Sequence, residues 1–530
     1  MTIERWQPRA SYTKQEQLLL GRLRRTRKLF AFLRDHRQEL FDDAFQSELA
    51  TMYRDTGAGR DPVPPALLAM ASLLQSYLQV SDAEAVEMTV VDLRWQMVLD
   101  HLGQQEPAFS QGALREFRER LIRTNMDRRL LERPMEFARR TNAFDWRKLP
   151  KDLRVAIDSS PLEGAGRVED TINLLGHAAR KVVDCAAELL GWGADRVARE
   201  AGIPVLLEPS VKKGLDRVWG TEEAMNDAVT TLVKQLDSLE AWLKKRLVDE
   251  ISRPPLKEHV ETLRQLREQD LEPDPSGNGR IRIREGTAED RRISIEDKDM
   301  RHGRKSKSQR INGYKRHIAT DLDTQLIVAC AVTPANRPEQ EAMPTIKDDI
   351  ACLERAIGEL QIDRGYIASP IVTEILDGGG LVICKPWVAR NGDLYSKADF
   401  KLNLRTMTIT CPAGETQPIE LGATVSFPST TCRECPLRDQ CTTSASRGRQ
   451  VSIADDELLQ QRLRKLAASP AGRERLRERV DIEHSLAHLS RRQGPRARYR
   501  GTRKNLYDVR RAAVVQNLET VHRQLERKAA

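Results

Sequence analysis

The chain has 530 residues, of which 39% are hydrophobic and 31% charged, a globular composition spread over more length than one ordinary core accommodates. Lysine and arginine number 87 against 78 acidic residues, and the formal net charge of +9 favours a polyanionic partner such as nucleic acid. The first residues lack an apolar leader and no run of about eighteen uninterrupted apolar residues occurs, so we expect a cytoplasmic protein without a membrane partner.

Helical signals dominate residues 1–150. Pro65 opens an apolar run, in the first-turn position that proline tolerates. A capping-box pattern from Ser81 to Glu84 predicts another helix start, and Ser110 precedes an arginine-rich helix. Because no catalytic constellation occurs here, we predict a helical DNA-binding or dimerisation domain.

An apolar run from Arg154 to Ile157 predicts a buried strand that ends in Asp158. The Ser-Ser-Pro segment at 159–161 follows and is expected to stop the strand. A carboxylate beside a core is costly unless it is paired or binds a metal, whereas an Asp that caps a turn is also common. The strand alone leaves both interpretations open. Long helices are then expected from about 170 to 270.

Strand signals return after this helical stretch. In chain order the sequence predicts a hairpin (313–321 and 326–332), a helix (339–357), a strand (360–363), a helix (370–376) and a strand (381–384). The strand after the hairpin again ends in a carboxylate, Asp363. Alternating strands and helices of this kind indicate a mixed sheet with helices on its faces.

A third carboxylate comes from residues 473–490, which we treat as one helix. Plotted at about 100° per residue, its apolar residues share one face, and Glu483 falls inside that face. A Glu turned toward a core requires a partner. Either a salt bridge with Arg479 or a metal shared with Asp158 and Asp363 would satisfy it. The apolar face comprises Leu476, Val480, Leu486, Ala487 and Leu489.

Three carboxylates at one sheet edge suit metal-dependent phosphoryl transfer. Two divalent cations about 3.5–4 Å apart would clamp the attacking and leaving oxygens of a phosphodiester. Water or a DNA 3′-hydroxyl is then the nucleophile. The chain has no phosphate-cradling Walker loop, no nucleophile elbow and no HExxH motif, so those enzyme classes lose support.

Nearly the whole chain resembles the DDE transposases of bacterial insertion sequences, which have an RNase H-like catalytic core. The segments that carry the resemblance are DPVPPALLAMASLLQSYLQVSDAEA, VAIDSSPLEGAG, DMRHGRKSKSQRINGYKRHIATDLDTQLI, VTPANRPEQEA, IDRGY and RERVDIEHSLAHLSRRQGPRARYRGTRKN. The resemblance implies an α/β fold with an RNase H-like mixed sheet. It also implies Asp158, Asp363 and Glu483 as the catalytic triad, which would hold two Mg²⁺ (or Mn²⁺) ions.

Related transposases often carry the pattern Tyr-x2-Arg-x3-Glu-x6-Lys around the Glu. Arg479 and Glu483 match it here, whereas Leu476 stands at the Tyr position and Ser490 at the Lys position. The departure concerns how the enzyme handles the flanking strand or a hairpin intermediate more than it concerns the metal site.

The resemblance further implies partners and a domain organisation. The partners are double-stranded DNA, both element ends and target, and a second copy of the chain in a homodimer at the nucleoid. The expected domains are helices at 1–150, the first part of the core at 151–390 with a helical insertion at about 170–290, a four-cysteine insertion at 391–460, and C-terminal core helices at 461–530.

Basic residues cluster on either side of the expected carboxylates. Such clusters fit phosphate contacts, which position DNA without reading its sequence, although a charge run is often only a solvated face. The residues we assign to DNA binding are Arg301, Arg304, Lys305, Lys307, Arg310, Arg479, Arg491, Arg492, Arg496, Arg498, Arg500, Arg503 and Lys504.

Four of the eight cysteines gather between Asp363 and Glu483. They are Cys411, Cys432, Cys435 and Cys441, and the middle two form a CxxC. Four thiolates with one close pair suit a tetrahedral structural Zn²⁺. Reduced free thiols, or an iron–sulfur or redox pair, remain alternatives because the last spacing is longer than in a second CxxC.

Together these features predict a transposase that binds the terminal inverted repeats of its insertion sequence, cuts at the ends and joins them to a target. A related nuclease or a degenerate transposase that no longer cuts is one alternative. A non-enzymatic DNA-binding protein, built on the helical N-terminus and the cysteines, is another.

Overall fold

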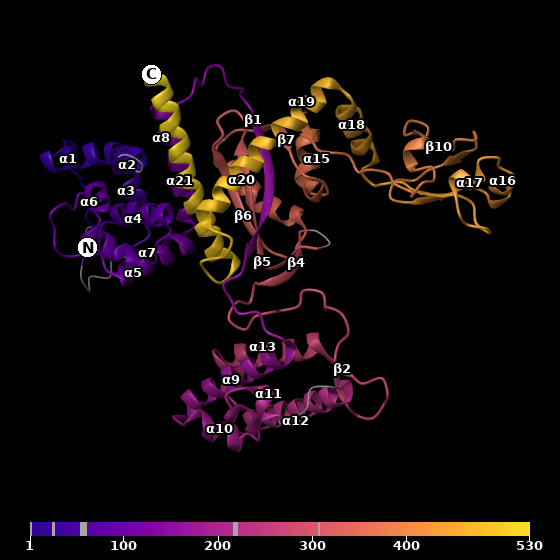
Figure 1. The fold of residues 1–530 in the computed structure, drawn as a ribbon, viewed down its shortest axis with the longest axis horizontal. Helices are drawn as coiled ribbons and strands as arrows, with labels where there is room; N and C mark the ends of the chain where they lie inside the picture. Colours follow the sequence, from indigo (N-terminus) through magenta and orange to yellow (C-terminus); the bar gives the residue numbers. More distant parts are fainter. Residues whose placement is uncertain (1–2, 24–26, 54–60, 216–220, 306–307) are drawn as a thin grey trace.

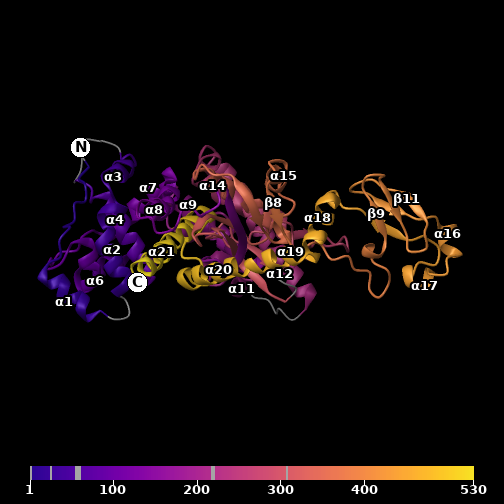
Figure 2. The same ribbon diagram turned by 90° about the horizontal axis from the view of Figure 1, so that it is seen from above.

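The computed structural model describes residues 3–23, 27–53, 61–215, 221–305 and 308–530. Figure 1 shows helices on either side of a central sheet and a module of short strands at one end of the molecule, and Figure 2 shows the same elongated order from above. Among the described residues, no helix has both the length and the apolar character needed to cross a lipid bilayer.

The N-terminal segment is helical, as expected. The Ser81–Glu84 capping box is formed, and the Ser110 side chain accepts a hydrogen bond from the Ala113 backbone N–H at the start of α7. Pro65 is the first residue of α4. The helices are α1 (Lys14–Arg22), α2 (Arg27–Leu40), α3 (Asp43–Ala50), α4 (Pro65–Leu78), α5 (Asp82–Val91), α6 (Leu93–Leu99), α7 (Gln111–Thr124) and α8 (Met126–Arg140).

A six-stranded mixed sheet forms the centre of the molecule. Its strands follow the order β4-β5-β1-β7-β8, and β6 pairs with β5 beyond the end of β4. The pairs of β5 with β1, β4 and β6 are antiparallel, whereas β1–β7 and β7–β8 are parallel. The strands are β1 (Leu153–Glu163), β4 (Arg301–Arg304), β5 (Arg310–Asp321), β6 (Ile327–Pro334), β7 (Ile357–Gln361) and β8 (Leu381–Ile383).

Strand β1 does not stop at the Ser-Ser-Pro segment, and that expectation was wrong. The strand continues to Glu163, with Pro161 opposite Lys315 of β5. Its pairing with β7 ends at Ala156, so Pro161 lies where that edge of β1 has no neighbour and its missing N–H removes no bond from that ladder. Asp158 is therefore within a strand and not at its end.

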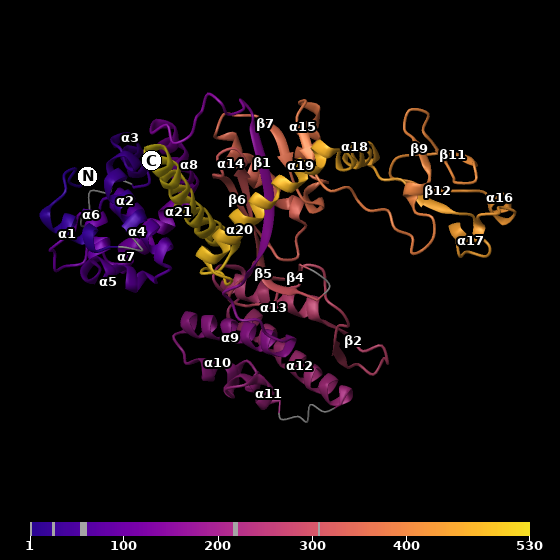
Figure 3. The same cartoon turned by 45° about the horizontal axis from the view of Figure 1, so that its top comes forward.

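Helix α21 joins the sheet to the N-terminal helices. It runs between the two groups in Figures 1 and 3, and its buried Arg510 pairs with Asp127 of α8 and Asp349 of α14. Sheet, α21 and N-terminal helices share one continuous hydrophobic core. The helices around the sheet are η3 (Glu339–Ala342), α14 (Met343–Ala351), η4 (Arg364–Tyr366), α15 (Pro370–Asp377), α18 (Glu457–Ala468), α19 (Pro470–Glu478), α20 (Val480–Gln493) and α21 (Thr502–Ala529).

Two further groups each have a hydrophobic core of their own. The first, below the sheet in Figure 1, packs around Leu232, Leu236 and Leu239. It comprises α9 (Thr171–Leu190), α10 (Ala194–Glu200), η1 (Pro204–Leu207), α11 (Val211–Gly214), α12 (Glu222–Arg246), η2 (Glu250–Ser252), α13 (Leu256–Asp270), β2 (Leu271–Pro273) and β3 (Ile281–Ile283).

The second group is the module at the far end from the N-terminal helices. Its small core contains Phe400, Ile409 and Phe427. It comprises η5 (Lys397–Asp399), β9 (Lys401–Asn403), β10 (Thr408–Thr410), β11 (Thr416–Pro418), β12 (Thr424–Ser426), α16 (Ser429–Arg433), α17 (Arg438–Cys441) and β13 (Gln450–Ser452).

Candidate active site

Parallel strands β1 and β7 place two aspartates at equivalent positions. The last residue pair of the two strands is Ala156 with Gln361, and Asp158 and Asp363 each follow it by two residues. Beyond this pair the strands separate, while β5 still supports Asp158 through its pairing with Ile318. The sheet therefore brings both carboxylates to one opening between its strands.

Helix α20 adds Glu483 to the same place. All three carboxylates line a cavity of about 950 Å³. A hydrogen bond of 3.3 Å between the hydroxyls of Ser160 and Ser490 links α20 to β1 near this cavity. Ser490, which stands at the Lys position of the family pattern, thus contacts the sheet.

The expected burial of Glu483 was wrong. Residues 473–490 form two helices, α19 and α20, that meet at Arg479, so a single helical projection does not apply to them. Glu483 and, one turn later, Ala487 are exposed and line the cavity. Val480, which was expected on the apolar face, is also 47% exposed. The face of α20 that packs inward carries Ile482, Ser485, Leu486 and Leu489.

Arg479, at the break between the two helices, is buried against the aspartates. It donates hydrogen bonds to the Asp363 carboxylate and, at 3.2 Å, to the Ile362 carbonyl, and its other terminal nitrogen lies 3.9 Å from Asp158. It therefore pairs with these aspartates instead of Glu483. Because only 8% of its side chain is exposed, we do not propose Arg479 as a DNA contact.

Asp158 is the most enclosed of the three carboxylates, with 17% of its side chain exposed against 51% for Asp363. Burial, together with the charges of Asp363 and Glu339, raises the pKa of Asp158 to about 6. The Ser159 backbone N–H, 2.8 Å away, and Arg479 act in the opposite direction. A desolvated carboxylate of this kind is stabilised by any cation that enters the cavity.

The donor set fits hard divalent cations, which prefer carboxylate oxygens. The Arg479 guanidinium supplies the positive charge between the Asp158 and Asp363 carboxylates. Across the described part of the chain, no three His, Cys, Asp or Glu side chains converge closely enough to form a finished metal site.

A buried network behind the aspartates was not found from the sequence. His317 is fully buried and bonds the Tyr366 hydroxyl at 2.7 Å and the Thr333 hydroxyl at 2.9 Å. Burial lowers the pKa of His317 to about 3, so the imidazole is neutral at physiological pH. His317 lies opposite Ser159 in the ladder, a relation that only the strand register reveals.

The cavity also contains a fourth acidic residue, Glu339, at the start of η3. The Ser159 hydroxyl donates to Glu339 Oε1 at 2.5 Å. The PANRPEQEA segment around Glu339 gives no sign of this role, because one Glu in an acidic helix start carries no distinct signal.

The basic residues before β5 and those after α20 have different surroundings. Arg304 and Lys305 are exposed and line the cavity, and Arg310 is exposed nearby, whereas Arg301 pairs with Asp290. Lys307 lies outside the described residues. Three further cations line the cavity and were not assigned from the sequence: Lys315, Arg364 and Lys385.

After α20 most of the assigned arginines contact other parts of the protein, and their assignment to DNA binding stays a prediction. Their partners are backbone carbonyls or acidic residues from distant elements, and charge alone does not reveal such partners. Arg491, Arg496, Arg500 and Lys504 are exposed. The contacts are Arg492 with Glu519, Arg496 with Gly164 and Ala165, Arg498 with Val80, Arg500 with Glu296, and Arg503 with Asp127.

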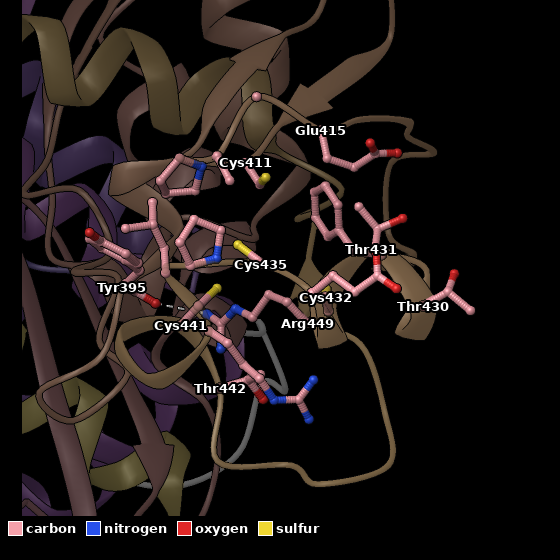
Figure 4. A pocket seen from close by; sticks show the side chains of 18 residues that line it. Tyr395, Cys411, Glu415, Thr430, Thr431, Cys432, Cys435, Cys441, Thr442 and Arg449 are labelled. Carbon is pink, nitrogen blue, oxygen red and sulfur yellow. Dashed lines mark hydrogen bonds between the residues drawn. The ribbon is translucent and has the colours of Figure 1, made fainter.

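The four clustered cysteines line a second pocket, of about 660 Å³, in the far module. Figure 4 shows Cys411, Cys432, Cys435 and Cys441 around this pocket. All four are free thiols of intermediate exposure. Burial and the other three cysteines raise the pKa of Cys441, whereas nearby Arg449 lowers it. Soft thiol donors suit zinc, although they do not converge into a finished site here.

Comparison with known proteins gives two matches along the chain. Residues 408–522 match the family described as transposase DDE domain, and residues 24–120 match the transposase domain (DUF772). The first match includes the cysteine pocket and Glu483, and the second lies within the N-terminal helices. No curated protein and no solved structure matches the chain. Together the two matches support a DDE transposase of the insertion-sequence type.

Proposed function

We propose that the cavity is the active site of this transposase, with Asp158, Asp363 and Glu483 as its catalytic residues. The protein would bind the terminal inverted repeats of its element, cleave at the ends and transfer them to target DNA. The observation that carries the proposal is the meeting of these three carboxylates, from β1, β7 and α20, in one cavity. We further propose that the sheet is an RNase H-like core, which its mixed strand directions support.

Two Mg²⁺ or Mn²⁺ ions, when bound, would supply Lewis-acid stabilisation of the attacking and leaving oxygens. Asp158 and Asp363 would hold them from the sheet, and Glu483 from the helix. In the metal-free protein Arg479 offsets the repulsion between the two aspartates. The neutral His317–Tyr366 pair fixes the strand from behind without adding a charge.

The cations of the cavity would position the DNA backbone. Arg304, Lys305, Lys315, Arg364 and Lys385 line the same space as the carboxylates, so a phosphate chain that enters it meets several positive side chains. These contacts are independent of base sequence. We assign recognition of the element ends to the N-terminal helices (1–150), which would also contribute to a homodimer on paired ends.

We also propose that Cys411, Cys432, Cys435 and Cys441 bind one structural Zn²⁺. The proposal is supported by the pocket that the four cysteines share and by their thiols, which form no disulfide with one another. Such a metal would stabilise a module whose strands are three residues long and whose hydrophobic core is small. It has no assigned part in cleavage.

Strand cleavage of a duplex that carries an element end, in the presence of Mg²⁺, tests the proposed function. We expect the wild-type protein to cleave and Glu483→Gln to bind the same duplex without cleaving it. Glu474→Gln is the matched control, because Glu474 is an exposed carboxylate on the neighbouring helix α19, outside the cavity. Equal cleavage by wild type and Glu483→Gln contradicts the assignment. Binding without cleavage by all three proteins favours a non-enzymatic DNA-binding protein or a degenerate transposase.

A further inference from the structure

Glu339 occupies a position that contacts both aspartate-bearing segments. On one side its Oε1 accepts the hydrogen bond from Ser159, the residue after Asp158. On the other side it lies against Gly365, two residues after Asp363. One carboxylate is thus fitted between the two aspartates of the proposed site, in the same cavity.

Gly365 creates the space for this carboxylate. A Cβ atom at residue 365 would lie 2.1 Å from Glu339 Oε2, much closer than van der Waals contact. The glycine has no positive φ that would explain its presence by backbone conformation. The absence of a side chain at Gly365 therefore allows Glu339 to lie beside the Asp363 turn.

Glu339 has no ion-pair partner among the described residues, although Lys315 and Arg364 line the same cavity. Arg479 bonds Asp363 instead, and Arg337 lies near Glu341. A half-buried carboxylate beside another is unfavourable without a counter-ion, so a cation in the cavity would relieve both.

Resting on the proposed function, we propose that Glu339 is a fourth acidic ligand of the divalent-cation site in this cavity. Four ionised carboxylates carry a charge of −4, which equals and opposes that of two divalent cations before a DNA phosphate enters. The ligand set then comes from β1, η3, the turn after β7, and α20. Glu339 would supply its oxygens from a segment that contacts Ser159 and Gly365, close to both aspartates.

Mn²⁺ binding to the full-length protein, followed by the electron paramagnetic resonance signal of free Mn²⁺, tests this proposal without DNA. Glu339→Gln keeps an oxygen that accepts the Ser159 hydrogen bond and removes only the charge. We expect its Mn²⁺ affinity to fall roughly 10- to 100-fold, the range seen when metal-site partners are lost. Glu341→Gln, an exposed residue of the same short helix outside the cavity, should bind as wild type does.

Gly365→Ala provides an independent variant that keeps every charge. The added methyl group displaces the Glu339 carboxylate, so Mn²⁺ affinity should fall in this variant too, while thermal stability without metal stays close to wild type. This variant decides the matter if Glu339→Gln does not fold. Wild-type affinity in either folded variant overturns the proposal.

Asp158→Asn separates this proposal from the proposed function. If Asp158→Asn loses Mn²⁺ binding while Glu339→Gln retains it, only the assignment of Glu339 fails. If Asp158→Asn binds Mn²⁺ as wild type does, the cation site itself is elsewhere and both proposals fail. Loss of affinity in both variants, with Glu341→Gln unaffected, supports both.

Discussion

The carboxylate cavity and the cysteine pocket both gather side chains that suit metals, yet they are built differently. Asp158 and Asp363 extend from paired strands of a six-stranded sheet, with the buried His317 behind them. The cysteines extend from short strands, short helices and loops around a small core. We infer that the sheet holds the carboxylates in place without metal, whereas the proposed zinc would be needed to order the cysteine module. Four predictions test this difference.

The largest effect is expected from Asp158→Asn. Cleavage of an end-containing duplex should fall below detection, because a carboxylate that would hold a cation is lost. The amide has no charge to desolvate, so the thermal midpoint of the metal-free variant should be no lower than that of wild type. Calorimetry beside the cleavage assay checks both. An inactive variant that is also clearly destabilised would show that Asp158 has a structural role instead.

Loss of a cysteine should disorder the module and leave the sheet intact. We expect metal analysis to find about one zinc per wild-type chain, and Cys432→Ser or chelation to expose residues 391–460 to protease. Structural zinc sites of peptides contribute roughly 10–16 kcal/mol, more than such a small core can replace. Cys352→Ser, at an exposed cysteine outside the pocket, is the control. If the wild-type protein contains no zinc and its cysteine module still resists protease, the module does not need a metal for order, and the expected difference between the two pockets is absent.

The two basic groups should respond differently to alanine substitution. Arg503 bonds the buried Asp127, so Arg503→Ala should lower the free energy of unfolding by roughly 1.5–3 kcal/mol, as for hydrogen bonds to charged groups. Lys305 is exposed in the cavity, so Lys305→Ala should leave stability unchanged and reduce the salt dependence of DNA binding by about one counterion. Urea unfolding and binding at several salt concentrations measure these effects. If Arg503→Ala changed only DNA binding and Lys305→Ala changed only stability, the two assigned roles would be wrong.

The smallest effect concerns the support behind the cavity. His317 has a pKa of about 3 in the folded protein against 6.5 when unfolded, so the unfolded chain binds the extra proton as the pH falls. Its contribution to stability is present above pH 6.5 and is lost below it, by at most about 1.4 kcal/mol per pH unit. Urea unfolding of wild type and His317→Gln between pH 7 and 5 should show this slope in wild type alone. Parallel curves would mean that His317 titrates normally.

The sequence indicated the sheet and the two aspartates because both depend on local patterns. Apolar runs followed by Asp158 and Asp363 are visible in any short window. Glu483 was selected through a single-helix projection that the break at Arg479 invalidates, although the structure still places it in the cavity. Strand β1 passes Pro161 because its neighbour β7 has already ended, which no local pattern shows.

Other features depend on contacts between distant residues. Glu339 and His317 acquire their roles from a turn and a strand register, and their own segments look ordinary. The arginines after α20 look like a DNA-binding run, yet Arg500 and Arg503 pair with Glu296 and Asp127, hundreds of residues away. Charge density predicts where cations are but not what they bind.

Anomalous diffraction from crystals of the wild-type protein soaked in Mn²⁺ tests the central claim most directly. We predict metal density in the cavity, about 2.1 Å from carboxylate oxygens of Asp158, Asp363 and Glu483, with Arg479 released from Asp363. Metal bound elsewhere, or an empty cavity in a protein that still cleaves its element ends under the same conditions, would contradict the account.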